Sequence, residues 1–405
     1  MAALSRRFVI KLILKYKTDI KKSLKGIIYM KKIALVGSTG SIGRQVINVV
    51  RRYPDRFKLV ALIANSSVEA FGTQLDTIKP AYAALTDEQS AKRLTAPDGV
   101  KLLSGDSGAL TALDECGADV IVVACGGFAG LKYSLKAAEL GVPLALANKE
   151  TLVCGGDLVM PKIKEIMPVD SEHSAIWQCL DFDRNAPFDS LVITASGGAF
   201  RGRKWNSLAS VTPAEALRHP TWKMGAKITV DCATLLNKGY EIIEAHHLYN
   251  APYEKISAVI HPQSIVHSMV RFADGATLAQ MSYPTMELPI QLALSYPERL
   301  DCALPQLDFC KAFSLEFLPL DGKDYPLFSL ALDCGEAGGI YPTALNAASE
   351  VAVNAFLNGG LRFTDIYTVA DKVVAQTANE RVQSYEQLAE ADLRARETAA
   401  MIIQN

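Results

Sequence analysis

Two carboxylates separated by a single serine are the clearest candidates for chemistry in this chain. Asp170, Ser171 and Glu172 directly follow a short apolar run, Ile166 to Val169. In an extended stretch, residues two apart point to the same side, so we expect Asp170 and Glu172 to converge on one point. Converging carboxylates suit Mg²⁺ or Mn²⁺, which also keep water and substrate oxygens as ligands. The plainer alternative is a turn and a helix capped by Asp170 or Ser171.

A third carboxylate lies on a helix that we expect further along the chain. Asn237, Glu241 and Glu244 are spaced four and three residues apart, so they share one helical face. Glu241 is a candidate third metal ligand, and Lys238 is a candidate contact for a phosphate. We expect Glu244 to make a surface contact or to support the site from behind.

Two candidate phosphate contacts precede that face. Residues 228–230 have the composition of a strand, and Asp231 would cap a helix that begins at Cys232. The backbone N–H of Cys232 would then lie at the positive end of the helix, a position that favours an anion. Ser196-Gly197-Gly198, after a strand at 191–194, is a candidate anion-binding nest, with a simple hairpin turn as the alternative.

The opening of the chain predicts the element that holds a nucleotide. A buried strand, Lys32 to Val36, leads into the glycine-rich stretch Gly37 to Gly43 and then an apolar helical pattern. This order places backbone N–H groups against a pyrophosphate. The next strand ends at Asn65-Ser66-Ser67, where an NAD-specific site would carry an acidic residue for the ribose 2′-hydroxyl. We therefore predict NADPH, with Ser66 and Ser67 near its 2′-phosphate.

Further alternating strands and helices predict the fold class. Strands at 81–85, 120–124 and 144–147 indicate a doubly wound parallel sheet, with ligands beyond the carboxyl ends of its strands. Asn148-Lys149-Glu150 falls at one such end, so we expect Lys149 to contact substrate. The polar segment 201–226, with Trp205, His219, Trp222 and Met224, is long enough to be a lid.

The whole chain is predicted to be α/β, with a Rossmann-like sheet, a central α+β catalytic domain of antiparallel-looking strands and a C-terminal helical bundle. The expected divisions, in order, are 1–29 as a basic extension, 30–153 for NADPH, 154–295 for catalysis, metal and dimerisation, 296–326 as connector and 327–405 as helical domain.

Composition excludes some classes of protein. The net charge of −1 argues against a nucleic-acid surface, and no run of 18 apolar residues predicts a membrane span. The eight scattered cysteines indicate reduced core residues in a cytoplasmic protein. Residues 1–29 are rich in lysine and arginine, so a plastid transit segment is the alternative to an extension upstream of Met30.

Taken together, these motifs resemble the 1-deoxy-D-xylulose 5-phosphate reductoisomerase family. The resemblance runs from Lys31 nearly to the C-terminus and depends on the order and spacing of separate blocks: Gly37 to Gly43, Ala147 to Glu150, Pro168 to His173, Ser196 to Gly198, His219-Pro220 with Trp222 and Met224, Asn237 to Gly239 with Glu241, His261 to Ser264, and Ala344 to Ala348.

The resemblance implies a V-shaped homodimer and a metal bound by Asp170, Glu172 and Glu241. It implies that the substrate is held by Lys149, Ser171, Glu172, Ser196, His219, Cys232, Asn237, Lys238 and Glu241, with catalytic roles for Lys149, Glu172 and His219. It implies cofactor contacts at Thr39, Gly40, Ser41, Ile42, Asn148, Glu150 and Gly225. The family commonly has a glycine, a basic residue and an asparagine at 65–67, and a serine at Cys232, so this chain departs there.

The implied reaction is isomerisation and NADPH-dependent reduction of 1-deoxy-D-xylulose 5-phosphate to 2-C-methyl-D-erythritol 4-phosphate, a step toward isoprenoid precursors. One rival is a semialdehyde-type dehydrogenase, for which Cys154 is the candidate nucleophile, although no histidine lies near it in sequence. A non-catalytic NADP-binding sensor is the other, but it leaves the three carboxylates unexplained.

Overall fold

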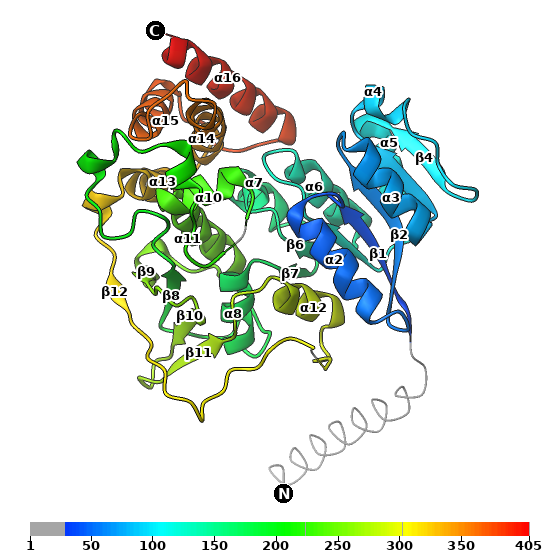
Figure 1. The fold of residues 1–405 in the computed structure, drawn as a ribbon, viewed down its shortest axis with the longest axis horizontal. Helices are drawn as coiled ribbons and strands as arrows, with labels where there is room; N and C mark the ends of the chain where they lie inside the picture. The colour runs from blue at the N-terminus through cyan, green and yellow to red at the C-terminus, as the bar shows by residue number, and fades with distance from the viewer. Residues whose placement is uncertain (1–28, 223, 302, 405) are drawn as a thin grey trace, which may run out of the picture.

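The N-terminal part is built around a parallel sheet (Figure 1). The structure, a computed structural model, describes residues 29–222, 224–301 and 303–404, so residues 1–28 of the expected extension lie outside it. The seven parallel strands have the order β4-β3-β2-β1-β5-β6-β7. The strands that follow β1 in sequence are placed first on one side of it (β2 to β4) and then on the other (β5 to β7), so the strand order changes sides between β1 and β5. They are β1 (Lys31–Val36), β2 (Phe57–Ala64), β3 (Tyr82–Leu85), β4 (Lys101–Ser104), β5 (Val120–Val123), β6 (Leu144–Leu146) and β7 (Ile166–Pro168).

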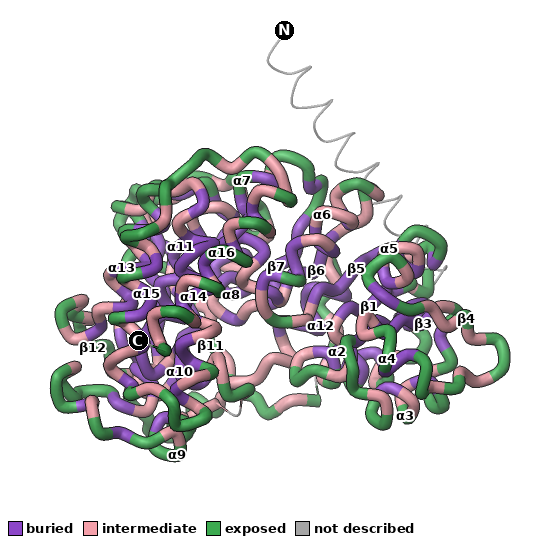
Figure 2. The backbone as a smooth tube through the Cα atoms, turned by 90° about the horizontal axis from the view of Figure 1, so that it is seen from above, coloured by how far each residue is buried: buried purple, intermediate pink, exposed green. Residues whose placement is uncertain are grey.

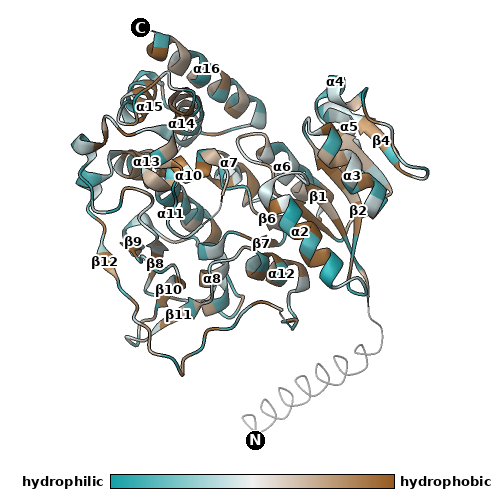
Figure 3. Ribbon diagram, in the orientation of Figure 1, coloured by the Kyte–Doolittle hydropathy of each residue, from teal (hydrophilic) through white to brown (hydrophobic). Residues whose placement is uncertain are grey.

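Helices connect these strands and cover the sheet, which explains the composition of the strands. Residues 33–36 of β1 and 120–123 of β5 are buried, as expected for parallel strands covered on both faces. Figure 3 shows much of the labelled strands β1 and β2 in the hydrophobic colour. The helices are α2 (Ser41–Arg52), α3 (Val68–Ile78), α4 (Glu88–Ala91), α5 (Gly105–Glu115), α6 (Gly130–Leu140) and α7 (Glu150–Val159).

The central part contains a second, five-stranded sheet with the order β11-β10-β8-β9-β12. Its strands are β8 (Ser190–Ala195), β9 (Ile256–Ile260), β10 (Val266–Arg271), β11 (Thr277–Met281) and β12 (Leu318–Pro319). The expectation of antiparallel pairing was wrong for β8 and β9, which pair in parallel. Around the sheet lie α8 (Ser171–Cys179), η1 (Trp205–Leu208), α9 (Pro213–Ala216), α10 (Ala226–Ala233), α11 (Leu236–Tyr249), η2 (Tyr253–Lys255) and α12 (Glu287–Ser295).

The strand predicted at 228–230 was wrong, because these residues belong to α10. Thr229 and Val230 are β-branched, but both are buried, and packing has overridden their preference for strands. Leu235 then adopts a left-handed conformation (φ 57°) that separates α10 from α11. Cys232 therefore lies in the last turn of α10, so the predicted helix start at Cys232 and its cap at Asp231 were also wrong.

The C-terminal part is helical, as predicted. A largely irregular connector runs from residue 296 along the edge of the second sheet, where it contributes β12, to η3 (Gly322–Asp324) (Figure 1). The helices that follow are α13 (Pro326–Ala337), α14 (Tyr341–Leu357), α15 (Asp365–Gln376) and α16 (Tyr385–Gln404). Figure 2 shows buried backbone in the interior of both main parts and exposed backbone along the connector.

The first predicted domain boundary cuts through continuous structure. Residue 153 lies inside α7, and β7, beyond that boundary, is the last strand of the first sheet. We therefore propose that the first domain extends to about residue 168. Within the residues that the structure describes, every helix is too short or too polar to cross a lipid bilayer.

Candidate active site

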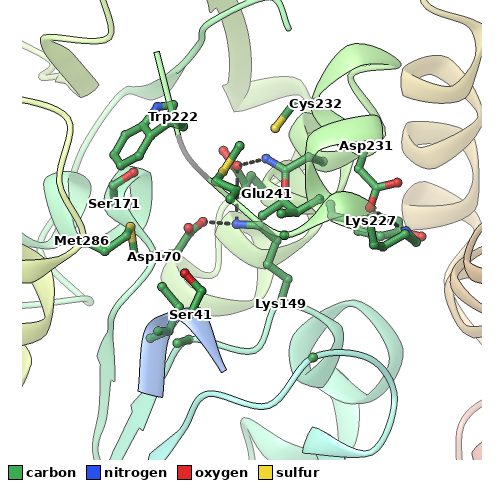
Figure 4. Close-up of a pocket in the computed structure, with 18 of the residues that line it drawn as sticks. Ser41, Lys149, Asp170, Ser171, Trp222, Lys227, Asp231, Cys232, Glu241 and Met286 are labelled. Carbon is green, nitrogen blue, oxygen red and sulfur yellow. Dashed lines mark hydrogen bonds and ion pairs between the residues drawn. The ribbon is translucent and has the colours of Figure 1, made fainter. Parts of the chain in front are cut away.

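A cavity of about 1100 Å³ lies where the first sheet meets the helices of the central and C-terminal parts. Ligand sites typically occupy 300–1000 Å³, so this space is large enough for a dinucleotide together with a small substrate. Its walls come from the turn before α2, the ends of β5 and β6, and helices α8, α10, α11 and α14. Figure 4 shows side chains of this lining that come from the start of α2, the end of β6, α8, α10 and α11.

The nucleotide end of the cavity is shaped by glycines that have no room for a side chain. A Cβ on Gly37 (φ +85°) would lie 2.4 Å from the backbone nitrogen of Cys125, and one on Gly43 would lie 2.2 Å from the carbonyl oxygen of Gly37. Gly40, Ser41 and Ile42 line the cavity at the start of α2, where unpaired backbone N–H groups favour an anion. This geometry fits a dinucleotide pyrophosphate.

Three predicted cofactor residues do not line the cavity. Ser66 and Ser67 are exposed between β2 and α3, and Thr39 lies in the turn before α2. The side-chain oxygen of Asn65 accepts a hydrogen bond from Thr86 (2.9 Å). A nucleotide 2′-phosphate at this end would therefore lie close to solvent.

Asn148 and Glu150 lie where β6 ends. The amide nitrogen of Asn148 donates to the carbonyl oxygens of Cys125 and Gly127 (both 3.0 Å) and to Glu150 (2.6 Å). Its amide oxygen accepts from the backbone and hydroxyl of Thr151. Asn148 therefore positions the turn after β5. Burial raises the pKa of Glu150, whose side chain lines the cavity.

The three predicted metal ligands meet in the centre of the cavity. One oxygen from each of Asp170, Glu172 and Glu241 lies within 4.8 Å of the others. The extended stretch expected through Glu172 was wrong, because Ser171 and Glu172 lie in the first turn of α8, and only Asp170 before it keeps a non-helical backbone (φ −57°, ψ 135°). The helix of the plainer alternative is thus present, although neither Asp170 nor Ser171 caps it with a side-chain hydrogen bond. Three hard oxygen donors fit Mg²⁺ or Mn²⁺.

Two lysines, the buried Lys238 and the partly buried Lys149, balance these carboxylates. Lys238 donates to Glu172 (2.9 Å) and to Glu241, and Lys149 donates to Asp170 (2.5 Å) and lies 3.5 Å from Glu241. Burial opposes their charge, but the neighbouring carboxylates raise the pKa of both lysines.

The carboxylates respond differently to the same surroundings. Although burial acts to raise it, the pKa of Glu172 is lowered by Lys238 and Lys149. Burial and the negative charge of Glu172 raise the pKa of Glu241 to about 7. Asn237 donates to Glu241 (2.6 Å), and Ser171 donates to Glu172 (2.6 Å). These hydrogen bonds fix the directions of both carboxylates.

Glu244 supports this centre from behind, which was one of the two roles expected for it. It is 3% exposed and lies 3.2 Å from Nε2 of His173 and 3.9 Å from Nζ of Lys149. His173 is fully buried, and its carbonyl oxygen accepts from Tyr249 (2.5 Å). Glu244 raises the pKa of His173 against the effect of burial. We did not predict from the sequence that His173 supports Asp170. Its position three residues after Asp170 was a signal, because residues three apart lie on the same face of a helix.

A second group of predicted substrate residues lies on the wall formed by 196–225. Nδ1 of His219 accepts from the backbone N–H groups of Thr221 (3.1 Å) and Trp222 (2.9 Å). Nε2 therefore carries the proton and donates to Ser196 (2.9 Å). Burial lowers the pKa of His219, which favours this neutral form. The Trp222 ring lies 6.3 Å from His267, and Gly225 lines the cavity before α10.

Cys232 reaches the cavity with its side chain rather than with a helix N-terminus. It is partly exposed and lines the wall, and burial raises the pKa of its thiol. The loop at Gly198 packs so closely on α10 that an added Cβ would lie 2.3 Å from the Cys232 carbonyl oxygen. Ser196 and Cys232 therefore belong to one wall of the cavity.

The cysteine nucleophile of the dehydrogenase alternative is not supported. Cys154 lies inside α7, is 3% exposed, and has a thiol pKa raised well above its ordinary value by burial. A buried, protonated thiol outside the cavity lining cannot attack a substrate there.

Comparison with known proteins gives the same family throughout the chain. Profiles described as 1-deoxy-D-xylulose 5-phosphate reductoisomerase, and as its C-terminal domains, match residues 33–156, 166–249 and 281–398. The reductoisomerase of Thermomicrobium roseum is 46% identical over 92% of this chain and 97% of its own length. That of Chlorobaculum tepidum is 45% identical over 92% of this chain and 100% of its own.

Solved structures agree with this assignment. The Zymomonas mobilis reductoisomerase in complex with NADPH is 36% identical, with a TM-score of 0.86 over 93% of this chain and 100% of that one. A reductoisomerase complex with NADPH, fosmidomycin and magnesium is 35% identical, with a TM-score of 0.86 over 93% and 98%. The fold, the cavity and the relatives agree, and the chain belongs to the 1-deoxy-D-xylulose 5-phosphate reductoisomerase family.

Proposed function

We propose that this chain converts 1-deoxy-D-xylulose 5-phosphate into 2-C-methyl-D-erythritol 4-phosphate, using NADPH and a divalent metal ion. The observation that carries the proposal is the cluster of Asp170, Glu172 and Glu241 in a cavity that also contains the glycine-rich nucleotide turn. NADPH supplies hydride, and Mg²⁺ or Mn²⁺ supplies Lewis-acid stabilisation of charge on the substrate oxygens.

The residues around the carboxylates have distinct tasks in this proposal. Asp170, Glu172 and Glu241 hold the metal ion, while Glu244 and His173 keep Asp170 in place. Lys149 and Lys238 balance the carboxylates in the structure described here. With metal and substrate present, both ammonium groups can turn toward substrate oxygens, where positive charge stabilises the charge that develops during C–C bond rearrangement.

A second set of residues on the cavity lining binds the substrate phosphate. Ser196, His219, Cys232 and Asn237 offer hydrogen-bonding groups on the cavity lining. Neutral His219 donates through Nε2 and holds the backbone turn at Trp222 through Nδ1. Closure of the segment 201–226 would exclude water from the reacting atoms.

A homodimer is part of the proposal. β11 is an edge strand of the second sheet and exposes Leu278 (50%) and Met281 (37%). The connector exposes Phe309 (63%), Phe313 and Phe317. Exposed apolar residues at a sheet edge favour pairing with another chain. Sedimentation should give the mass of a dimer, and Leu278→Asp should shift it toward monomer.

We place the enzyme in a reducing compartment, the cytoplasm. The support is chemical: the seven cysteines in the described part of the chain are all free thiols.

The direct test is oxidation of NADPH, followed by its absorbance, with 1-deoxy-D-xylulose 5-phosphate as substrate. We expect turnover with Mg²⁺ or Mn²⁺, loss of turnover with EDTA, and recovery on adding metal. NADPH oxidation that needs no metal, or no turnover at all, would contradict the proposal. The latter outcome with bound NADPH would support the non-catalytic sensor instead.

A further inference from the structure

The C-terminal helices form one wall of the nucleotide cleft. Glu350, Val351, Val353, Asn354 and Leu357 of α14 and Arg396 of α16 line the same cavity as the glycine-rich turn. They also touch the first domain, because Phe128 stacks on Tyr385 with ring centroids 5.7 Å apart. This wall is therefore fixed against the turn that follows β5.

Glu350 is the acidic group of this wall nearest the first domain. A Cβ on Gly127, in the turn after β5, would lie 3.1 Å from Oε1 of Glu350. Arg396 donates to Oε2 of Glu350 (2.6 Å), and Asn346 donates to Oε1 (3.1 Å). Arg396 also pairs with Asp392 (2.7 Å), which does not line the cavity. The carboxylate of Glu350 is thus held in a set position on the cleft wall.

The topology of the sheet indicates which half of a dinucleotide this wall faces. Strand order reverses between β1 and β5, and the two halves of a dinucleotide lie on either side of that point. The adenosine half lies over β2, so the nicotinamide half lies over β5 and β6. Gly127 and Glu350 are on the β5 side.

A second carboxylate of the cavity lining, Asp231 of α10, has one oxygen without a hydrogen-bond donor among the described residues. Asp231 is 6% exposed and lines the cavity, and its Oδ1 has no hydrogen-bond partner within the described part of the chain. The negative charge of Glu350 contributes to raising the pKa of both Glu150 and Asp231, after the larger effect of burial. Glu350 thus acts on both carboxylates, while Lys227, which pairs with Asp231 and lines the same cavity, offsets part of the negative charge. A carboxylate oxygen accepts more than one hydrogen bond, so Glu350 has room for hydroxyl donors of a ligand beside Arg396 and Asn346.

We propose that Glu350 is a cofactor ligand contributed by the C-terminal bundle, and that its carboxylate accepts hydrogen bonds from the ribose hydroxyls of the nicotinamide half of NADPH. Arg396 is the positioning residue that holds the carboxylate. The proposal rests on the proposed function, since it requires NADPH in this cleft. It assigns the C-terminal domain a direct part in cofactor binding.

Binding constants of two nucleotides test this role without measuring turnover. NADPH contains the nicotinamide ribose, whereas adenosine 2′,5′-bisphosphate lacks that half. We expect Glu350→Gln to weaken NADPH binding about tenfold, or ~1.4 kcal/mol, and to leave the bisphosphate within twofold of the unaltered chain. Both constants are measured by isothermal titration calorimetry.

Asp392→Asn is the matched control, because it removes the other carboxylate of Arg396 without changing the cavity wall. We expect this variant to bind both nucleotides normally. Equal weakening by Asp392→Asn and Glu350→Gln, or equal weakening of both nucleotides, would overturn the ligand role in favour of a structural one. Normal NADPH binding by Glu350→Gln would also overturn it.

The two proposals fail in different ways. If the unaltered chain turns over substrate with NADPH while Glu350→Gln binds NADPH normally, only the role of Glu350 is wrong. If the unaltered chain does not bind NADPH, the proposed function fails and the role of Glu350 fails with it.

Discussion

The two ends of the same cavity are built in opposite ways. At the centre, Asp170, Glu172 and Glu241 are held by Lys149 and Lys238 in a buried set of ion pairs. At the adenosine end, residues 65–67, which follow β2, are exposed and uncharged, and none of them is part of the cavity lining. The first region has fixed geometry before any ligand binds, whereas the second offers a surface on which a phosphate meets solvent.

This contrast teaches where the chain tolerates change. A buried charge without its partner costs 3–5 kcal/mol, so substitutions at the centre should be severe. An exposed hydrogen bond contributes far less because water replaces it. The variants below test that contrast, from the largest expected effect to the smallest.

Glu241→Gln keeps the shape of the side chain but removes a charged metal ligand. We expect turnover at saturating Mg²⁺ to fall by at least about 100-fold, since even residues that only support metal ligands account for 10–100-fold. NADPH binding, measured by calorimetry, should stay within twofold. Glu254→Gln, at an exposed position, is the control. Normal turnover by Glu241→Gln at low Mg²⁺ would remove the distinction between the two ends.

Glu244→Gln tests the layer behind the metal ligands. The variant weakens the contact with His173, which lies 3.8 Å from Asp170. We expect the Mg²⁺ concentration needed for half-maximal turnover to rise about 10–100-fold. Turnover at saturating Mg²⁺ should be nearly restored. An unchanged Mg²⁺ requirement would show that the centre does not depend on this support.

Ser66→Arg adds a cation at the exposed end. The unaltered chain should prefer NADPH over NADH, but less strongly than a site with an arginine–phosphate pair. The variant should bind NADPH about tenfold more tightly, or ~1.4 kcal/mol, which is just below the range for hydrogen bonds to charged groups because the site is exposed, and it should bind NADH unchanged. Catalytic efficiencies with both cofactors measure this. A preference of the unaltered chain for NADH would contradict the assignment.

Cys232→Ser gives the phosphate wall a stronger donor. The thiol is a weak donor on the cavity lining, and a hydroxyl there should lower the KM for substrate about threefold to tenfold. Metal dependence should not change, and Cys232→Ala should change little. A lower melting temperature with an unmoved KM would mean that the thiol serves only in packing.

The smallest expected effect is a loss of folding stability in acid that originates at His219. The folded-state pKa is lower than the ordinary value of 6.5, so the folded chain binds fewer protons than the unfolded chain. The free energy of unfolding should therefore fall as the pH drops below about 6.5. His219→Gln should reduce this slope in urea titrations between pH 7 and 5. An equal slope in both proteins would exclude His219 as its source.

Local patterns in the sequence determined much of this protein. The buried strands, the glycine-rich turn and the helical C-terminus follow from apolar periodicity and from glycine positions with no room for a Cβ. The face shared by Asn237, Glu241 and Glu244 follows from helical spacing alone. Residue types and spacing suggested Asp170, Glu172 and Glu241 as metal ligands, and the family resemblance implied the same set. These residues do meet, although residues 170–172 lie at a helix start rather than in an extended stretch.

Only the tertiary structure decided how distant segments share one cavity. Packing made residues 228–230 helical and so placed Cys232 at the end of α10. Tertiary packing, which no local sequence pattern predicts, placed Glu244 against His173. It also brought Glu350 of the C-terminal bundle beside Gly127. Spacing along a chain fixes which side chains share a face, but the cost of burying charge is set by groups that arrive from elsewhere in the fold.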